Sequence, residues 1–256
     1  MSEQRKQGPG SDEVVIRFDG VVKVLGGRRV LDGLSFDVHR GETLVIMGPS
    51  GTGKSVTLRH VVGLMQPDEG RVEVDGSDMA SIGKKELAEL RKRTGYLFQD
   101  GALINWLSVG ENIALPLREN TKLGEDEIRA RVEERLDLVK LPGIWETMPG
   151  DLSGGMRKRV GLARALVTDP EIVLYDEPNA GLDPETSQTI NDLIRDLADR
   201  LDITSVVVTH LVSCVRTVAD RVILLDGGGI VVDLEKDAFL SSDNERLLRF
   251  LGKDPD

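Results

Sequence analysis

Cysteine and long apolar runs are both scarce in this sequence. Its 256 residues contain one cysteine, Cys214, which excludes an intramolecular disulfide and a zinc site built from several cysteines. The longest apolar runs, such as Leu44–Met47 and Val222–Leu225, fall far short of the roughly 18 residues that a membrane-spanning helix needs. We therefore expect a chain from a reducing compartment that does not cross a membrane by itself.

An excess of positive charge is also missing. The 33 lysines and arginines are outnumbered by 44 aspartates and glutamates, so the formal net charge is 33 − 44 = −11. Proteins that wrap nucleic acid need a positive surface to displace counterions, and this composition argues against nucleic acid as a partner. Residues 1–12 are polar and lack the apolar segment of a secretory signal, so we expect a disordered N-terminus there.

Short apolar runs alternate with amphipathic patterns along the chain. Leu44–Met47, Ile172–Tyr175 and Val206–Val208 are largely or wholly apolar, as expected of strands buried on both faces. The spacing of apolar residues within Leu123–Leu141 and Ile190–Leu201 predicts two helices. This alternation predicts an α/β fold with a mostly parallel sheet.

The N-terminal part of the chain differs in pattern from its middle third. Val14–Phe18 and Leu34–Val38 predict a small antiparallel arrangement, whereas Gly101–Leu166 is helix-rich and predicts a separate helical lobe. Further helices are expected over Lys54–Leu64 and Glu86–Arg93, and further strands over Arg71–Val74, Tyr96–Phe98, Val222–Leu225 and Ile230–Val232.

One glycine-rich segment follows a predicted buried strand and precedes a predicted helix. It matches the pattern G-x-x-x-x-G-K-[ST], in which the glycines let successive backbone N–H groups point at phosphate oxygens. The following helix adds its positive N-terminal end, the lysine supplies a cation, and the hydroxyl can ligate Mg²⁺. A chance glycine-rich turn would not require this context, so we interpret the segment as a nucleotide phosphate site. Its residues are Gly48, Pro49, Ser50, Gly51, Thr52, Gly53, Lys54 and Ser55.

Two carboxylates follow the apolar run Ile172–Tyr175. A buried strand holds its end rigidly, so Asp176 can fix Mg²⁺ while Glu177 positions a water for attack on a γ-phosphate. An acidic pair that merely caps a strand is equally common on its own. Together with the phosphate loop, the pair is interpreted as catalytic.

A second candidate anion site lies at Ser153-Gly154-Gly155. Ser153 is a good helix N-cap, and the two glycines expose backbone N–H groups to close approach by an anion. A plain cap with flexible glycines is the alternative. The position after the lysine loop and shortly before the Ile172 strand favours the anion site.

His210 follows the third buried strand. Parallel sheets bind ligands at the carboxyl ends of their strands, which favours a functional rather than a structural histidine. Cys214 is expected to be a small buried residue, and Trp106 and Trp145 are expected to be packing residues. The run 157–159 (Arg-Lys-Arg) is interpreted as the solvated face of its helix.

With these motifs in order, the chain resembles an ATP-binding cassette (ABC) ATPase from about Val14 to Phe250. Gly48–Ser55 resembles the Walker A motif, Gln99 the Q-loop, Leu152–Met156 the signature, Ile172–Glu177 the Walker B motif, Gly181–Asp183 the D-loop and His210 the H-loop. The resemblance implies a P-loop NTPase (RecA-like) core at about 13–100 and 167–240. It also implies an antiparallel β subdomain, an inserted helical subdomain at about 101–166 and a C-terminal helix at about 243–251.

The resemblance also implies a mechanism. Two copies would sandwich two ATP molecules, with Ser153, Gly154 and Gly155 contacting the nucleotide that the partner holds. Glu177 would act as general base, His210 would hold the γ-phosphate and water in register, and Gln99 would ligate Mg²⁺ with Ser55 and Asp176.

Two positions depart from the family pattern. Met156 stands where the signature usually has glutamine, which removes a polar side chain but no backbone donor. Leu25 stands where an aromatic residue often stacks on adenine, so base stacking is weaker or comes from another residue.

Finer details resemble the ATPases of Mla-type phospholipid transporters, also called Mce-associated or toluene-tolerance type. The residues concerned are Met47–Gly51, Phe98–Leu103 and Leu115–Glu119. The implied partners are an integral-membrane permease, an Mce-type lipid-binding protein and a small regulatory protein, with the ATPase peripheral on the cytoplasmic face of the inner membrane. The alternatives are an ABC transporter for another substrate, a soluble ABC ATPase of DNA repair or translation, and a small-molecule P-loop kinase.

Overall fold

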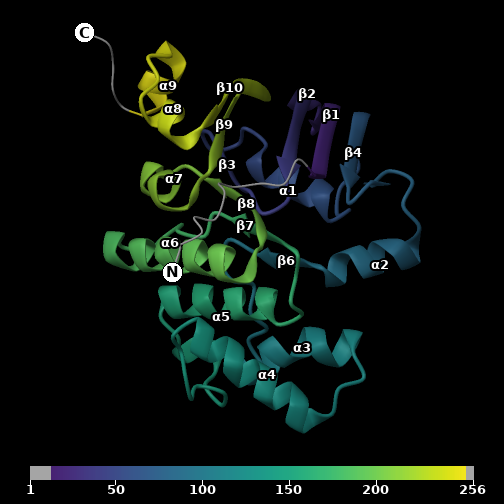
Figure 1. Ribbon diagram of the computed structural model, residues 1–256, viewed down its shortest axis with the longest axis vertical. Coiled ribbons are helices and arrows are strands. Elements are labelled where there is room, and N and C mark those ends of the chain that lie inside the picture. The colour runs from purple at the N-terminus through teal and green to yellow at the C-terminus, as the bar shows by residue number, and fades with distance from the viewer. Residues whose placement is uncertain (1–12, 252–256) are drawn as a thin grey trace, which may run out of the picture.

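The computed structural model describes residues 13–251 and contains two sheets with helices packed around them (Figure 1). The disorder expected for residues 1–12 lies outside the described range. Within residues 13–251, no helix is both long enough and apolar enough to span a bilayer. The expected α/β class, with one mostly parallel and one antiparallel sheet, is confirmed.

The larger sheet has six strands in the order β10-β9-β3-β8-β7-β6. Strands β6, β7, β8, β3 and β9 run parallel, and β10 pairs antiparallel to β9 at one edge. The strands are β3 (Thr43–Met47), β6 (Thr94–Leu97), β7 (Ile172–Asp176), β8 (Thr204–Thr209), β9 (Arg221–Asp226) and β10 (Gly229–Glu235).

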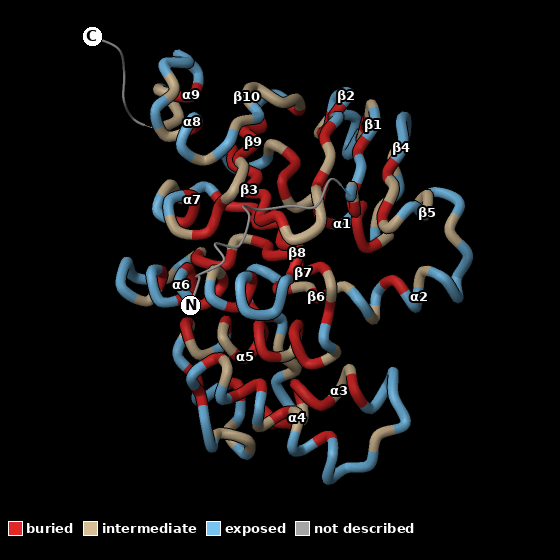
Figure 2. Tube along the Cα trace, in the orientation of Figure 1, coloured by how far each residue is buried: buried red, intermediate tan, exposed pale blue. Residues whose placement is uncertain are grey.

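Successive residues of the central strands enter two different hydrophobic cores. Val45 and Met47 of β3 face the core shared with the helices of the middle and the C-terminal part of the chain, whereas Leu44 and Ile46 face the core shared with the smaller sheet. Because both faces of β3 are covered, all five of its residues are buried, which explains its uninterrupted apolar sequence. Figure 2 shows this buried band through the middle of the molecule.

The smaller sheet is antiparallel, in the order β2-β1-β4-β5. Its strands are β1 (Val14–Leu25), β2 (Arg28–His39), β4 (Glu69–Val74) and β5 (Ser77–Asp78). The first two are twelve residues long, where the sequence predicted five each. Four register shifts interrupt the pairing of β1 with β2, three of them after Phe18. The two strands therefore stay paired although the alternation of their side chains between the two faces of the sheet is broken.

Helices pack on both faces of the larger sheet (Figure 1). Helices α3, α4 and α5 pack together at one end of the molecule, and α5 also contacts α6 and β6. The helices are α1 (Lys54–Val61), α2 (Lys84–Lys92), α3 (Val109–Asn120), α4 (Glu125–Leu138), α5 (Gly154–Leu166), α6 (Pro184–Leu201), α7 (Val212–Val218), α8 (Lys236–Leu240) and α9 (Glu245–Phe250).

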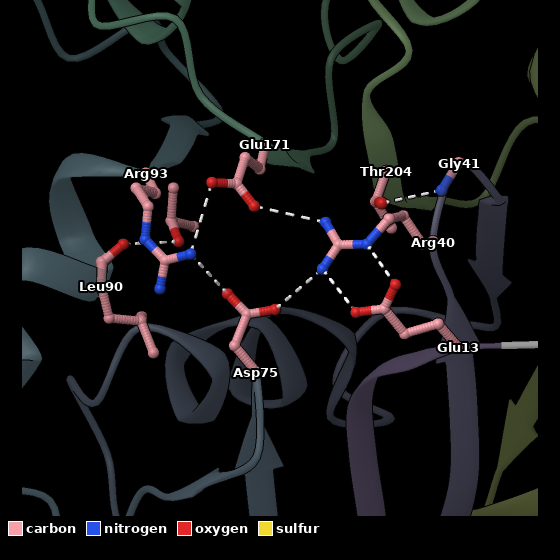
Figure 3. Close-up of polar contacts among 9 residues, drawn as sticks. Glu13, Arg40, Gly41, Asp75, Leu90, Arg93, Glu171 and Thr204 are labelled. Carbon is pink, nitrogen blue, oxygen red and sulfur yellow. Dashed lines mark hydrogen bonds and ion pairs between the residues drawn. The ribbon is translucent and has the colours of Figure 1, made fainter. Parts of the chain in front are cut away.

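A network of five charged side chains joins the two sheets at the edge where β6 and β7 begin (Figure 3). Arg40 lies 2.8 Å from Glu13, 3.7 Å from Asp75 and 3.2 Å from Glu171. Arg93 lies 3.2 Å from Asp75 and 3.3 Å from Glu171. Glu13, Arg40 and Asp75 adjoin strands of the smaller sheet, whereas Arg93 and Glu171 adjoin β6 and β7.

Replacing Arg40 by methionine removes the centre of this network and should lower Tm by roughly 1–4 °C at low salt. The loss should shrink at about 1 M NaCl, where the screening length falls to about 3 Å. Arg17→Met is the matched control, since within residues 13–251 Arg17 forms an ion pair with Asp37 alone, and it should cost less. Equal losses for both variants, or a loss that salt does not change, would contradict a cooperative network.

Candidate functional site

The phosphate loop connects β3 to α1 and depends on glycine at two positions. A Cβ atom on Gly48 would lie 2.4 Å from the Leu225 carbonyl oxygen, and one on Gly53 would lie 2.5 Å from a methyl carbon of Leu31. Gly53 also has a φ of 100°, which other residues rarely adopt. The segment therefore packs tightly against β9 of the larger sheet and β2 of the smaller sheet only because both positions lack a side chain.

Helix α1 presents an uncapped N-terminus at this loop. Gly53 is its N-cap and provides no side-chain acceptor, and no acidic residue occupies the first turn. The first N–H groups of the helix and the positive end of its dipole are thus available to an anion.

Lys54 is buried, with 6% of its surface exposed. Its Nζ donates to the carbonyl oxygens of Gly48 at 2.8 Å and Pro49 at 3.0 Å, and it lies 3.4 Å from Oε1 of Glu177. The ammonium group is therefore held inside the loop, where a triphosphate would meet it.

Asp176 ends β7 directly opposite the loop. Ser55 Oγ donates to its Oδ1 at 2.6 Å, and the Tyr96 hydroxyl donates to its Oδ2 at 3.2 Å. Burial, reinforced by the Asp176 carboxylate, raises the pKa of Tyr96, so that its hydroxyl remains a donor. The Ser55 and Asp176 oxygens are the hard ligands that Mg²⁺ prefers, and the groups present fit that ion.

Glu177 follows with a φ of 48°, in the left-handed region. Its Oε2 lies 2.9 Å from Nδ1 of His210, which follows the carboxyl end of β8. The side chain of Glu177 is 13% exposed, whereas that of His210 is 49% exposed. Strained backbone is common at functional sites, and here it accompanies a carboxylate bonded to an imidazole.

Lys54, Ser55, Glu177 and His210 line one cavity of about 440 Å³. Asp176 is not part of its lining and reaches the cavity through its hydrogen bond with Ser55. Gly48, Pro49 and Thr52 of the loop do not line it either. Gln99 lines it as well, on the loop after β6, so the structure brings together most of the residues singled out in the sequence. Val30, Val56 and Ala180 also line the cavity, and no sequence signal pointed to them. Leu25 does not line the cavity and is 39% exposed. The lining residues are Val30, Ser50, Gly51, Gly53, Lys54, Ser55, Val56, Gln99, Glu177, Ala180 and His210.

The second candidate anion site is separate from this cavity. Ser153 caps α5 by accepting a 3.2 Å hydrogen bond from the Met156 N–H, as expected. Ser153 and Gly154 are at least partly exposed, and neither they nor Gly155 line the cavity. Gly155, by contrast, is buried next to Thr186. The two candidate anion sites of one copy therefore do not face the same cavity.

Two sequence interpretations are wrong. The run 157–159 is not a solvated face beyond Arg157, which is exposed. Lys158 is 4% exposed, and the half-buried Arg159 donates to the carbonyl oxygens of Val139 and Lys140. Trp106 is not a packing residue, since it is 80% exposed. Trp145 does pack, against Gly110 and under the guanidinium of Arg129. Cys214 is fully buried, which raises the pKa of its thiol to about 12.

Comparison with known proteins gives consistent results. A family model described as ABC transporter matches residues 31–180. The chain is 44% identical over 238 residues to a "probable ribonucleotide transport ATP-binding protein" of Mycobacterium leprae, covering 93% of this chain and 69% of that one. It is 39% identical over 231 residues to the "intermembrane phospholipid transport system ATP-binding protein MlaF" of Haemophilus influenzae, covering 90% and 88%.

Among solved structures, the dimeric ATP-binding cassette MJ0796 in a post-hydrolysis state with ADP and Pi matches with a TM-score of 0.80 and 33% identity. The match covers 86% of this chain and 98% of that one. Since the family model matches more than half of the chain and the MlaF relative is aligned over most of both lengths, this chain belongs to the ABC transporter family and is one of its ATPases.

Proposed function

We propose that the chain is the motor subunit of a phospholipid transporter of the Mla type and that it works as a homodimer. The observation that carries the dimer is the separation of Ser153–Gly155 from the cavity that Lys54 and Glu177 line. Neither anion site can complete a reaction centre inside one copy. A head-to-tail pair would place the signature of each chain on the ATP held by the other.

In this pair, the loop 48–55 would bind the phosphates of ATP, with Ser55, Asp176 and Gln99 holding Mg²⁺. The metal would neutralise charge on the β- and γ-phosphates. Glu177 would take the proton of the attacking water, and the 2.9 Å bond from its Oε2 to His210 orients that carboxylate.

A second cavity, of about 410 Å³, is the candidate docking site for the membrane partner. It is lined by residues of α2, β6, the following loop, α3 and α5, including Tyr96, Phe98, Ile104 and Pro116. Phe98 stacks on Tyr96 with ring centroids 4.1 Å apart. We propose that a helix of the permease docks here, which would hold the ATPase at the cytoplasmic face of the inner membrane. The domain limits 101–166 for the helical subdomain and 13–100 with 167–240 for the core belong to the same proposal.

The lipid cargo is supported by the MlaF relative, whose alignment covers 88% of that protein. The Mycobacterium leprae protein, of which the chain spans about two thirds, carries a ribonucleotide name. A methionine import ATPase of Rhizobium johnstonii is 41% identical over 229 residues. An ATPase for another substrate is therefore the second candidate.

Purification of the tagged chain from detergent-solubilised membranes separates these candidates. We expect a polytopic permease, a lipid-binding protein of the Mce type and a small regulatory protein to copurify, with ATPase activity that phospholipid stimulates. Copurification with a permease and a soluble amino-acid-binding or nucleotide-binding protein would contradict the lipid cargo. Association with ribosomes or DNA would contradict transport altogether.

A further inference from the structure

Helix α5 is joined closely to the loop that carries Gln99. Arg164 donates to the carbonyl oxygens of Gly101 at 2.7 Å and Ala102 at 2.8 Å. A Cβ atom on Gly161 would lie 3.1 Å from Cα of Gly101, so helix and loop touch through their backbones. These contacts fix the position of the loop after β6 relative to α5.

The buried side chain of Lys158 connects α5 also to the segment that carries Glu177. The Nζ of Lys158, one turn after the start of α5, donates to the carbonyl oxygen of Gln99 and, at 3.1 Å, to that of Glu177. Among the described residues, hydrogen bonds from α5 to the segment after β7 come from this side chain alone. Lys158 thus bridges the loops that follow the neighbouring strands β6 and β7.

The surroundings of Lys158 are unusual for a lysine. Burial lowers its pKa, while Asp100, Glu177 and Asp176 favour the charged form. Within residues 13–251, no carboxylate lies within 4 Å of its Nζ. An ammonium group that is buried on neutral carbonyl oxygens is costly, and an apolar side chain of similar length would avoid that cost.

The contact with Glu177 falls on strained backbone. Glu177 has a φ of 48°, its N–H donates to the Val208 carbonyl at 3.0 Å, and its own carbonyl accepts from the Ala180 N–H at 3.1 Å. Lys158 adds the second donor to that carbonyl. The left-handed peptide that aims the Glu177 side chain is therefore held from the side of α5.

We infer that Lys158 is a positioning residue that couples α5 to both Gln99 and Glu177. Because α5 begins at Gly154, contact between the signature and the partner's ATP would set the orientation of the catalytic glutamate through this one side chain. The inference depends on the proposed hydrolytic site and adds a residue that the motif pattern does not contain.

Lys158→Met tests this inference, since methionine keeps the apolar stem and removes the donors. We expect kcat for ATP to fall roughly 10- to 100-fold, as small misplacements of reacting groups do, with KM within about twofold of wild type. Tm should be unchanged or higher. In a Glu177→Gln background, ATP-dependent dimerisation should persist. Arg159→Met is the matched control, because Arg159 donates to Val139 and Lys140 outside the site; it should keep kcat.

Three results would overturn the inference: kcat of Lys158→Met within twofold of wild type, an equal loss in Arg159→Met, or a loss of ATP affinity and Tm that accounts for the reduced turnover. Failure of the hydrolytic site itself would be seen separately, as wild-type turnover that Glu177→Gln does not reduce.

Discussion

Replacing Glu177 by glutamine should reduce ATP turnover by roughly 10²–10⁴-fold, the usual contribution of a general base, while ATP still binds. Glutamine has nearly the same size and retains an oxygen for the contact now made between Oε2 and His210. It cannot accept the proton of the attacking water. The measurement is phosphate release under saturating ATP, together with the affinity for a fluorescent ATP analogue.

Glu171→Gln is the matched control. Glu171 directly precedes the same strand, β7, but at the opposite end, where it pairs with Arg40 and Arg93 (Figure 3). Its substitution should leave turnover within about twofold. If Glu177→Gln also retained turnover within a factor of a few, the proton would be leaving by another route and the catalytic role of Glu177 would be wrong.

Lys54→Ala should weaken ATP binding by roughly 10- to 100-fold. A hydrogen bond to a charged group contributes about 1.5–3 kcal/mol, and each 1.4 kcal/mol is about tenfold in affinity. The Nζ now bonds to the carbonyl oxygens of Gly48 and Pro49, so it has to turn towards the phosphates when ATP enters. Isothermal titration with ATP measures the loss.

Lys85→Ala controls for the general loss of one positive charge, because Lys85 is exposed on α2. Its affinity for ATP should match wild type. An unchanged affinity in Lys54→Ala would remove the basis for assigning 48–55 as the phosphate loop.

Much of this architecture follows from local sequence. Strands β3, β7 and β8 are buried on both faces, which forces the largely apolar runs that identified them. The candidate phosphate loop could be found in the sequence because Gly48 and Gly53 are sterically required and the loop lies between a strand and a helix. Residues Lys54, Gln99, Glu177 and His210 meet at one cavity because parallel strands bring their carboxyl ends to the same edge.

Other features depend on tertiary contacts that no local pattern encodes. Lys158 and Arg159 look like a solvated charged run, and only the packing of α5 against neighbouring loops turns them inward. Trp106 looks like a core residue by composition but is exposed. Helices α7 and α8 were not predicted, since seven and five residues are too few to show a helical period.

The central claim is that two copies share each reaction centre. The most direct measurement is a structure of the Glu177→Gln chain trapped with ATP and Mg²⁺. We predict a head-to-tail dimer in which Gly154 and Gly155 of one copy contact the triphosphate bound by Lys54 of the other. A nucleotide-filled structure in which both glycines lie far from any triphosphate would contradict it.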